Sequence, residues 1–279
     1  ETLAALDAPL RKKLPVSVTA TGGYGRGIMN PCSDVDLLFL FPGNNAVIGT
    51  EAAKVIGDFL LFLYDLKFKV GHASRSVGET LRLSNADNET KTALIESRLI
   101  AGRPEAFNEL RKRFDKECMN GREIEFLRLR QTDLAARHAK HENTPFVQEP
   151  NVKTGCGGLR DYQNLIWMSY AKLRTTDLRD LIEKEMISRA GWRELEQAYD
   201  FLLRTRNELH YSERRSTDQL TLRLQGVVAT NLGYRHKTIL RRIEAFMHEY
   251  FTLTRNMLQR SSEVMDRFHL QSLDEKKIK

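Results

Sequence analysis

The stretch VSVTATGGYGRGIMNPCSDVDLLFLF, which spans residues 16–41, decides how the rest of the chain is interpreted. Its first part, from Val16 to Thr21, is typical of an extended, half-buried strand. Gly22-Gly23 ends that strand, because adjacent glycines permit a turn with positive φ and let the backbone approach a ligand closely. The apolar run from Leu37 to Phe41 predicts a second strand, which is buried.

Two carboxylates stand at the head of this second strand. Side chains two residues apart on a strand point to the same face, so we expect Asp34 and Asp36 to project together while Val35 faces the other way. Neighbouring carboxylates repel each other unless a cation lies between them. Mg²⁺ takes one or two carboxylates together with substrate phosphates. We therefore predict that Asp34 and Asp36 are catalytic residues and the metal ligands.

The residues around the two acids offer hydrogen-bond donors to a phosphate chain. We expect the backbone N–H groups of Gly22 and Gly23 to hold the β- and γ-phosphates, and Arg26 and Ser33 to add side-chain donors. A glycine turn for phosphates beside a carboxylate pair for a metal is the equipment of nucleotidyl transfer. The alternatives are an ordinary turn and a solvated Asp-x-Asp, since each feature alone is more often structural.

The order of these motifs resembles a known superfamily. Gly22-Gly23-Tyr24-Gly25-Arg26-Gly27 followed by Ser33-Asp34-Val35-Asp36-Leu37-Leu38 is similar to the nucleotidyltransferase signature of the DNA polymerase β superfamily. Within it, the chain most resembles the bacterial PII uridylyltransferase/uridylyl-removing enzymes, over roughly residues 10–270. The resemblance implies an α+β fold, in which a polymerase β-like nucleotidyltransferase domain (1–103) with a small mixed sheet precedes an all-α helical bundle (104–279).

Periodicity predicts the remaining elements of the first domain. The pattern β-turn-β-α-β indicates a small mixed α/β unit, followed by two shorter helices between residues 77 and 102. Asp87-Asn88-Glu89-Thr90 carries helix-capping chemistry before the second of these helices. The other expected elements are a partial helix over 1–15, a helix over 50–65 and a strand over 66–70 that ends at Gly71-His72.

The rest of the chain has helical periodicity. Several helices joined by short loops predict a bundle. In the last helix, one apolar stripe is marked by Leu240, Ile243, Met247, Tyr250 and Met257. The expected helices cover roughly 104–118, 121–141, 159–174, 178–189, 191–213, 218–230 and 236–267.

A second glycine-rich stretch, QEPNVKTGCGGLRD at residues 148–161, precedes one of these helices. A glycine-rich loop that opens a helix is a ready anion site, because the first N–H groups of a helix are unpaired and its dipole favours negative charge. The alternative is a flexible interdomain connector. A similar stretch follows the catalytic domain in the uridylyltransferase family, and the resemblance implies that Lys153 and Arg160 clamp the triphosphate.

A third carboxylate is harder to find. The resemblance implies one on the next strand, but the strand expected over 66–70 offers Lys67 and Lys69 and no acid. Asp87 is the first candidate and Glu96 the second. A separate polar cluster either holds an anion or forms a buried network within the bundle, and it comprises Arg204, Arg206, His210, Arg214, Arg215 and Asp218.

Composition excludes several classes of protein. No apolar run is long enough to span a bilayer, so no membrane partner is expected. Three scattered cysteines form neither a disulfide framework nor a metal motif, which indicates a reducing, cytoplasmic setting. The net charge is +7, but the basic residues are interspersed with acids on predicted helices, so a nucleic-acid partner is disfavoured.

The resemblance implies a function and leaves alternatives. It implies Mg²⁺-dependent transfer of UMP from UTP, a nucleoside triphosphate, to a tyrosine hydroxyl of the PII nitrogen-signalling protein, with release of pyrophosphate. No adjacent His-Asp pair occurs, which argues against the phosphohydrolase module that removes the nucleotide in the full-length family. The alternatives are a protein adenylyltransferase of the glutamine synthetase adenylyltransferase type, a non-catalytic nucleotide-sensing module, and a nucleic-acid polymerase.

Overall fold

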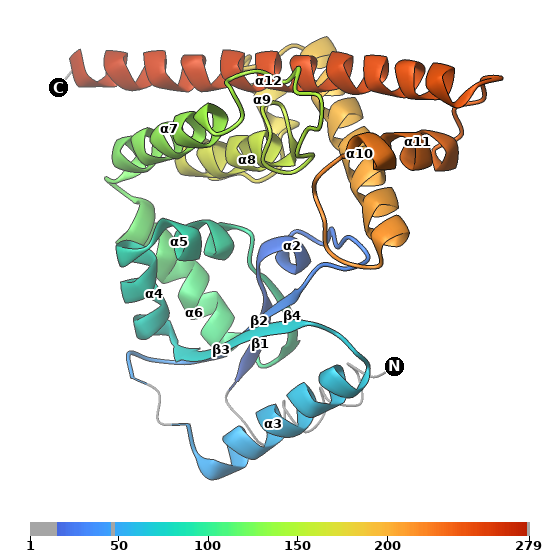
Figure 1. Ribbon diagram of the computed structural model, residues 1–279. Helices are drawn as coiled ribbons and strands as arrows, with labels where there is room; N and C mark the ends of the chain where they lie inside the picture. The colour runs from blue at the N-terminus through green and yellow to red at the C-terminus, as the bar shows by residue number, and fades with distance from the viewer. Residues whose placement is uncertain (1–15, 46–47, 278–279) are drawn as a thin grey trace. The chain divides into compact units, whose positions relative to one another are not determined.

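The computed structural model describes residues 16–45 and 48–277, and this part of the chain forms two compact units (Figure 1). The first unit contains the described residues up to 29 together with 33–122, and the second contains 30–32 and the residues from 123 onward. The helix predicted over 1–15 lies outside the described residues. A three-residue segment of the signature stretch therefore belongs to the second unit.

The first unit is built on a four-stranded mixed sheet. The strands lie in the order β3-β2-β1-β4, and β1 is antiparallel to both β2 and β4, whereas β2 and β3 are parallel. This sheet confirms the expected α+β class. The sequence pattern did not indicate β4, which is defined by its pairing with β1. The bounds are β1 Ser17–Ala20, β2 Val35–Phe41, β3 Val70–Ser76 and β4 Arg98–Gly102.

The third strand begins later than predicted. Helix α3 (Thr50–Asp65) occupies its expected range, but the residues after it end the helix and do not form a strand. Lys67 takes a φ of 64°, and the N–H of Phe68 donates to the carbonyl of Leu63. The strand predicted over 66–70 was therefore placed too early, and only Val70 of that range belongs to β3, because Leu66 and Lys67 form the turn that ends the helix. Strand β3 instead continues through Gly71 and His72, where the strand was expected to end.

The two faces of β2 have different surroundings. Its odd-numbered residues join the core beneath α3, where the rings of Phe39 and Phe59 meet edge to face with 6.0 Å between centroids. The alternate residues, beginning with Asp36, point to the other face. Asp36 lies opposite Gly71 in the parallel register, and Leu40 lies opposite Arg75. The acid therefore stands on the side of the sheet that α3 does not cover.

Capping side chains start the next helices of this unit. Ser76 caps α4 (Val77–Ala86), and Asp87 caps α5 (Asn88–Ile95) by accepting the N–H groups of Glu89 and Thr90, which confirms the predicted capping chemistry. Helix α6 (Glu105–Phe114) contacts β1, β2 and α4, and a π-helical turn (Asp115–Met119) follows it. Because α6 packs on the sheet, the division between the units falls after Arg122 and not after Arg103.

The second unit is helical, as expected. Its longest helix, α12, contacts α8, α10 and α11. The helix predicted over 178–189 was wrong, because only the short α9 forms there and Glu185 takes a φ of 54°. The helices are α7 (Glu123–Ala139), α8 (Leu159–Leu173), α9 (Asp180–Glu183), α10 (Arg189–Glu213), α11 (Leu222–Asn231) and α12 (Ile239–Lys277).

The apolar stripe predicted on α12 is only partly buried. Met247, Tyr250 and Met257 lie in the core, whereas Leu240 is 62% exposed. Ile239 and Ile243 approach Gly226 of α11. Because residues four apart share one helix face, Leu240 points away from α11. None of the described helices, including α12, combines the length and apolarity that a membrane crossing requires.

Candidate active site

The glycine turn has the geometry that the sequence predicts. Gly22 has a φ of 56° and begins a single helical turn, α2 (Gly22–Gly25). The N–H of Thr21 donates to the carbonyl of Asp36 at 3.0 Å, so the turn leaves the sheet at the level of that acid. No acceptor within residues 16–45 and 48–277 pairs with the N–H groups of Gly22 and Gly23. The turn therefore presents two available backbone donors.

The carboxylate of Asp36 stands between two glycines. A Cβ added at Gly22 would lie 3.0 Å from Oδ2 of Asp36, and one added at Gly71 would lie 2.6 Å from Oδ1. A side chain at Gly71 would collide with the carboxylate, and one at Gly22 would crowd it. The two glycines, one in the turn and one in the neighbouring strand, thus create the space in which Asp36 stands half-buried.

Asp34 lies directly before β2 and is exposed. Continued strand geometry would put its side chain on the face of Asp36, and that shared orientation stays a prediction. Ser33 is half-buried beside it. Among the described residues no group of three or more His, Cys, Asp or Glu side chains could hold a metal. A carboxylate pair completed by nucleotide phosphates still fits Mg²⁺, a hard ion that accepts oxygen ligands and keeps several waters.

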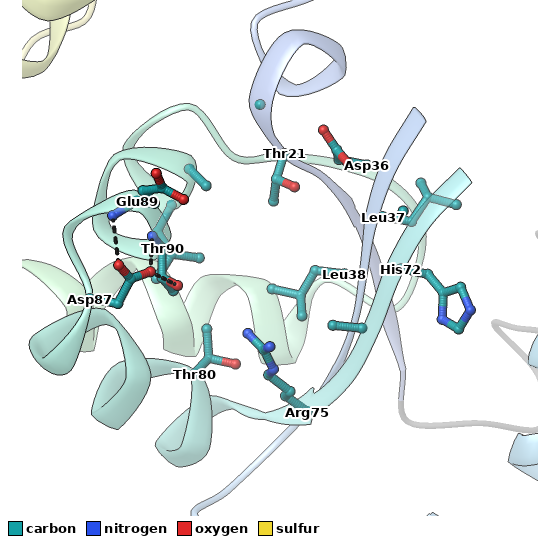
Figure 2. Close-up of a pocket in the computed structure, with 15 residues that line it drawn as sticks. Thr21, Asp36, Leu37, Leu38, His72, Arg75, Thr80, Asp87, Glu89 and Thr90 are labelled. Carbon is teal, nitrogen blue, oxygen red and sulfur yellow. Dashed lines mark hydrogen bonds between the residues drawn. The ribbon is translucent and has the colours of Figure 1, made fainter. Parts of the chain in front are cut away.

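A pocket of about 360 Å³ opens beside Asp36 (Figure 2). Its walls come from the glycine turn, from β2 and β3, and from α4 and α5. His72 is at its edge, but its ring points away from the hollow (Figure 2), because His72 is in register with Leu37 on the opposite face of the sheet. The polar side chains along the wall are Thr21, Asp36, Arg75, Thr80, Asp87, Glu89 and Thr90.

Arg26 forms an ion pair inside the first unit. Its Nη1 donates to the carboxylate of Glu96, whose side chain is only 3% exposed. The backbone of Gly25 packs against the Glu96 carbonyl, so the pair fastens the glycine turn to the end of α5. A role for Arg26 at a phosphate stays a prediction. Glu96, the second candidate for a third acid, holds this arginine.

Asp87, the first candidate for the third acid, lines the same pocket as Asp36. Its carboxylate accepts the Thr90 hydroxyl at 2.6 Å, the Thr90 N–H at 2.7 Å and the Glu89 N–H at 3.2 Å. These bonds, above all that from the Thr90 hydroxyl, hold the pKa of Asp87 below its usual value, so it is a weak base. Strand β3 has no acid, and its residue opposite Asp36 is Gly71.

The second glycine-rich stretch differs from the first, because its N–H groups are paired within the protein. Asn151 accepts from Lys153 and Thr154 through its side chain, and from Gly155 through its carbonyl. The N–H of Gly157 donates to Asp161 at 2.6 Å. The anion site predicted from unpaired amides is therefore wrong for this loop, and so is the alternative of a flexible connector.

Asp161 supplies the negative charge at the start of α8. Its side chain is fully buried, and it pairs with Arg137 and with Nε2 of His138, the latter at 3.0 Å. Arg160 lies over the ring of Trp167, with 5.3 Å from its Cζ to the ring centroid. Lys153 contributes to lowering the pKa of Asp218. The contacts given for Lys153 and Arg160 lie within the second unit, and their role at a triphosphate stays a prediction.

Part of the predicted basic cluster forms a buried polar network. Arg206 donates to Asp218 at 2.6 Å and also to Asn30, while Nδ1 of the fully buried His210 accepts the Cys32 N–H at 3.2 Å. Burial raises the pKa of Asp218, but His210 and Arg206 outweigh it and hold the pKa at about 2. Arg204, Arg214 and Arg215 are not part of this network. Arg204 pairs with Asp200 and Arg215 with Glu213, near the surface.

Comparison with protein families agrees with the division into two units. A nucleotidyltransferase-domain family model matches residues 6–96, and this match defines the class of the first unit. The family model described as GlnD PII-uridylyltransferase matches residues 125–265, about half of the chain. The chain therefore belongs to the GlnD PII-uridylyltransferase family.

Curated relatives support the same assignment. A bifunctional uridylyltransferase/uridylyl-removing enzyme of Rhodopseudomonas palustris is 38% identical over 242 residues, which are 87% of this chain and 26% of the relative. Enzymes with the same name from Bradyrhizobium diazoefficiens and Azospirillum brasilense are 36% and 38% identical over 87% and 86% of the chain. The chain spans about a quarter of the length of these relatives.

Proposed function

We propose that this chain transfers UMP from UTP to a tyrosine hydroxyl of the PII signalling protein and releases pyrophosphate. The observation that carries the proposal is the position of Asp36. It lies between Gly22 and Gly71, next to a turn whose two glycine N–H groups have no acceptor within the part of the chain that the structure describes. The relatives named as uridylyltransferases support the choice of nucleotide. Membership of the PII-uridylyltransferase family supports the choice of acceptor.

Each residue of the proposed site has a distinct task. Asp34 and Asp36 would hold Mg²⁺, which when bound neutralises charge that builds up on the phosphates. The N–H groups of Gly22 and Gly23 donate to the β- and γ-phosphates, since neither pairs with an acceptor among the described residues. The further donors that we assign to the triphosphate are Ser33, Arg26, Lys153 and Arg160.

The reaction needs an acceptor oxygen and a leaving group in line. The tyrosine oxygen forms a bond to the α-phosphorus, the bond to pyrophosphate breaks, and the hydroxyl proton passes to solvent water. We assign Asp87 no role as the base, because its lowered pKa and its three accepted hydrogen bonds suit it to capping α5. Positioning and electrostatics therefore carry most of the rate acceleration.

Asp36→Asn tests this function. Loss of one metal carboxylate is expected to lower the rate of label transfer from UTP to PII by about 10²–10⁴-fold. Asp58→Asn is the matched control, because Asp58 is exposed on α3, across the sheet. Transfer by Asp36→Asn at more than about a tenth of the unmodified rate would refute the assignment.

The label-transfer assay also distinguishes two other functions from uridylyl transfer. The absence of an acid on β3 favours a nucleotide-sensing module, which would bind UTP without turning it over. A protein adenylyltransferase would instead transfer label from ATP to glutamine synthetase. We also infer a cytoplasmic location, which is supported by Cys32, Cys118 and Cys156 being free thiols.

A further inference from the structure

Arg75 is a positively charged residue of the pocket beside Asp36, and the sequence analysis assigned it no role. It is half-buried, it lines the pocket, and its side chain extends from β3 into the hollow (Figure 2). Within the described part of the chain, the Arg75 side chain has no hydrogen bond, ion pair or ring contact. A guanidinium held partly out of water without a partner is ready to bind an anion.

The register of the sheet places Arg75 on the same face as Asp36. Asp36 lies opposite Gly71, and Arg75 follows Gly71 by four residues, so both side chains leave the same face. At about 3.3 Å per residue, the Cα of Arg75 is roughly 13 Å from that of Gly71. The long arginine side chain spans part of this distance, and Asp36 and Arg75 line one pocket of about 360 Å³.

The other arginines near the glycine turn are already engaged. Arg26 pairs with Glu96, and Arg98 donates to the carbonyls of Gly25 and Tyr24 at 3.3 and 3.0 Å. Among the described residues that line the pocket, Arg75 is the only lysine or arginine. None of the described acidic side chains that line the pocket forms an ion pair with Arg75. The carboxylate of Asp87 instead accepts hydrogen bonds from the N-terminus of α5.

We propose that Arg75 binds a phosphate oxygen of the nucleotide in the Asp36 pocket. The inference rests on the proposed function, since it adds Arg75, which lines the same pocket as Asp36, to the side chains that hold the triphosphate. The planar fork of arginine donates two parallel hydrogen bonds to phosphate, whereas lysine offers a point charge. Recognition is therefore expected to depend on the guanidinium as well as on the positive charge.

Binding of inorganic pyrophosphate and of UTP, with Mg²⁺ present, tests the inference by calorimetry. Arg75→Ala is expected to weaken both affinities about 10- to 100-fold, as for loss of hydrogen bonds to a charged group, and Arg75→Lys by a smaller factor. Arg82→Ala is the matched control, because Arg82 is exposed on α4 outside the pocket. Its affinities, and the thermal unfolding of all three variants, are expected to match the unmodified protein.

Three outcomes would overturn the inference. One is an Arg75→Ala protein that binds pyrophosphate and UTP within twofold of the unmodified protein. Another is loss of affinity for uridine equal to that for UTP, which would point to the base. The third is a raised KM for PII alone, which would place an acidic segment of the partner at Arg75.

The proposed function and this inference fail separately. Retained transfer by Asp36→Asn refutes the function, whereas pyrophosphate binding by Arg75→Ala still tests the role of Arg75. Loss of transfer in Asp36→Asn together with unchanged pyrophosphate binding in Arg75→Ala refutes only the role of Arg75.

Discussion

Gly71 illustrates how much a single residue can decide at this site. In the sequence it reads as the end of a strand, but in the fold it lies inside β3, opposite Asp36. A glycine inside a strand weakens the strand, and it is tolerated where something approaches the backbone closely. Here the approaching group is the carboxylate on which the proposed metal site depends.

Gly71→Ala is therefore expected to damage activity more than stability. The added methyl group would lie 2.6 Å from Oδ1 of Asp36, so the carboxylate must turn away. We expect kcat for uridylyl transfer to fall at least about tenfold and the Mg²⁺ concentration for half-maximal rate to rise, with a small change in Tm. Steady-state kinetics over a range of Mg²⁺ concentrations, together with thermal unfolding, compare Gly71→Ala with the unmodified protein.

Gly57→Ala serves as the control for Gly71→Ala. Gly57 lies on α3, and a Cβ added there meets nothing within 4 Å. Alanine is also the better helix former, by roughly 0.5–1 kcal/mol. This variant is expected to be fully active and slightly more stable. Equal kinetics of Gly71→Ala and Gly57→Ala would contradict the proposal that Gly71 leaves space for the Asp36 carboxylate.

At the scale of elements, the two glycine-rich segments have opposite roles. Among the described residues, no acceptor pairs with the N–H groups of the Gly22-Gly23 turn, whereas nearly all N–H groups of the loop from Asn151 to Gly158 donate to acceptors of the protein. Both look alike in sequence, because glycine content reports conformational freedom and not where the hydrogen bonds go. The second loop is an internally hydrogen-bonded segment that precedes α8 and packs against α12 at Gly157.

Gly157→Ala tests this structural role of the loop. Gly157 has a φ of 72°, and a Cβ there would overlap the carbonyl of Thr254 in α12. Gly233 has a φ of 90° but open space around its Cα, so Gly233→Ala isolates the backbone strain of about 1 kcal/mol. Chemical denaturation is expected to show Gly157→Ala less stable than Gly233→Ala by at least about 2 kcal/mol. Equal losses of stability would show that the loop moves away from α12 easily.

At the scale of the whole molecule, the signature stretch takes part in both units. Asn30 and Cys32 hydrogen-bond to α10, while the residues before and after them belong to the sheet unit. The network of Arg206, His210 and Asp218 thus holds a segment that directly precedes Ser33 and Asp34. Of the two hypotheses for the basic cluster, the buried network accounts for Arg206, His210 and Asp218 without a bound ligand.

The lowered pKa of Asp218 in this network leads us to expect that the stability of the fold depends on pH. The pKa of Asp218 is about 2 in the folded protein, below its usual 3.8, so its ionised form stabilises the fold. That contribution is complete above about pH 4 and is lost as the pH falls toward about 2. We estimate it at roughly 1–2 kcal/mol after allowance for solvent screening. Urea unfolding between pH 5 and pH 2.5 measures it.

Asp218→Asn is the comparison for the pH dependence. Asparagine cannot ionise, so the free energy of unfolding of this variant is expected to fall less between pH 5 and pH 2.5 than that of the unmodified chain. The difference between the two slopes, and not the absolute stability, is the test. Parallel slopes would show that Asp218 titrates alike in the folded and unfolded states.

Local patterns in the sequence determined the class of elements and much of their placement. The helix over 50–65, the cap at Asp87 and the strand ahead of Gly22 depend on residues close together in the chain, so periodicity and capping chemistry predicted them. The family resemblance, carried by the glycine turn and the Asp pair, agrees with the family comparison.

Tertiary structure alone decided what stands beside each of those residues. Strand β4 exists because β1 offers it a partner, Gly71 matters because the register puts it against Asp36, and Arg26 meets Glu96 across the unit. The physical reason is that these contacts join residues far apart in sequence, and no local preference records which groups a register or a packed helix brings together.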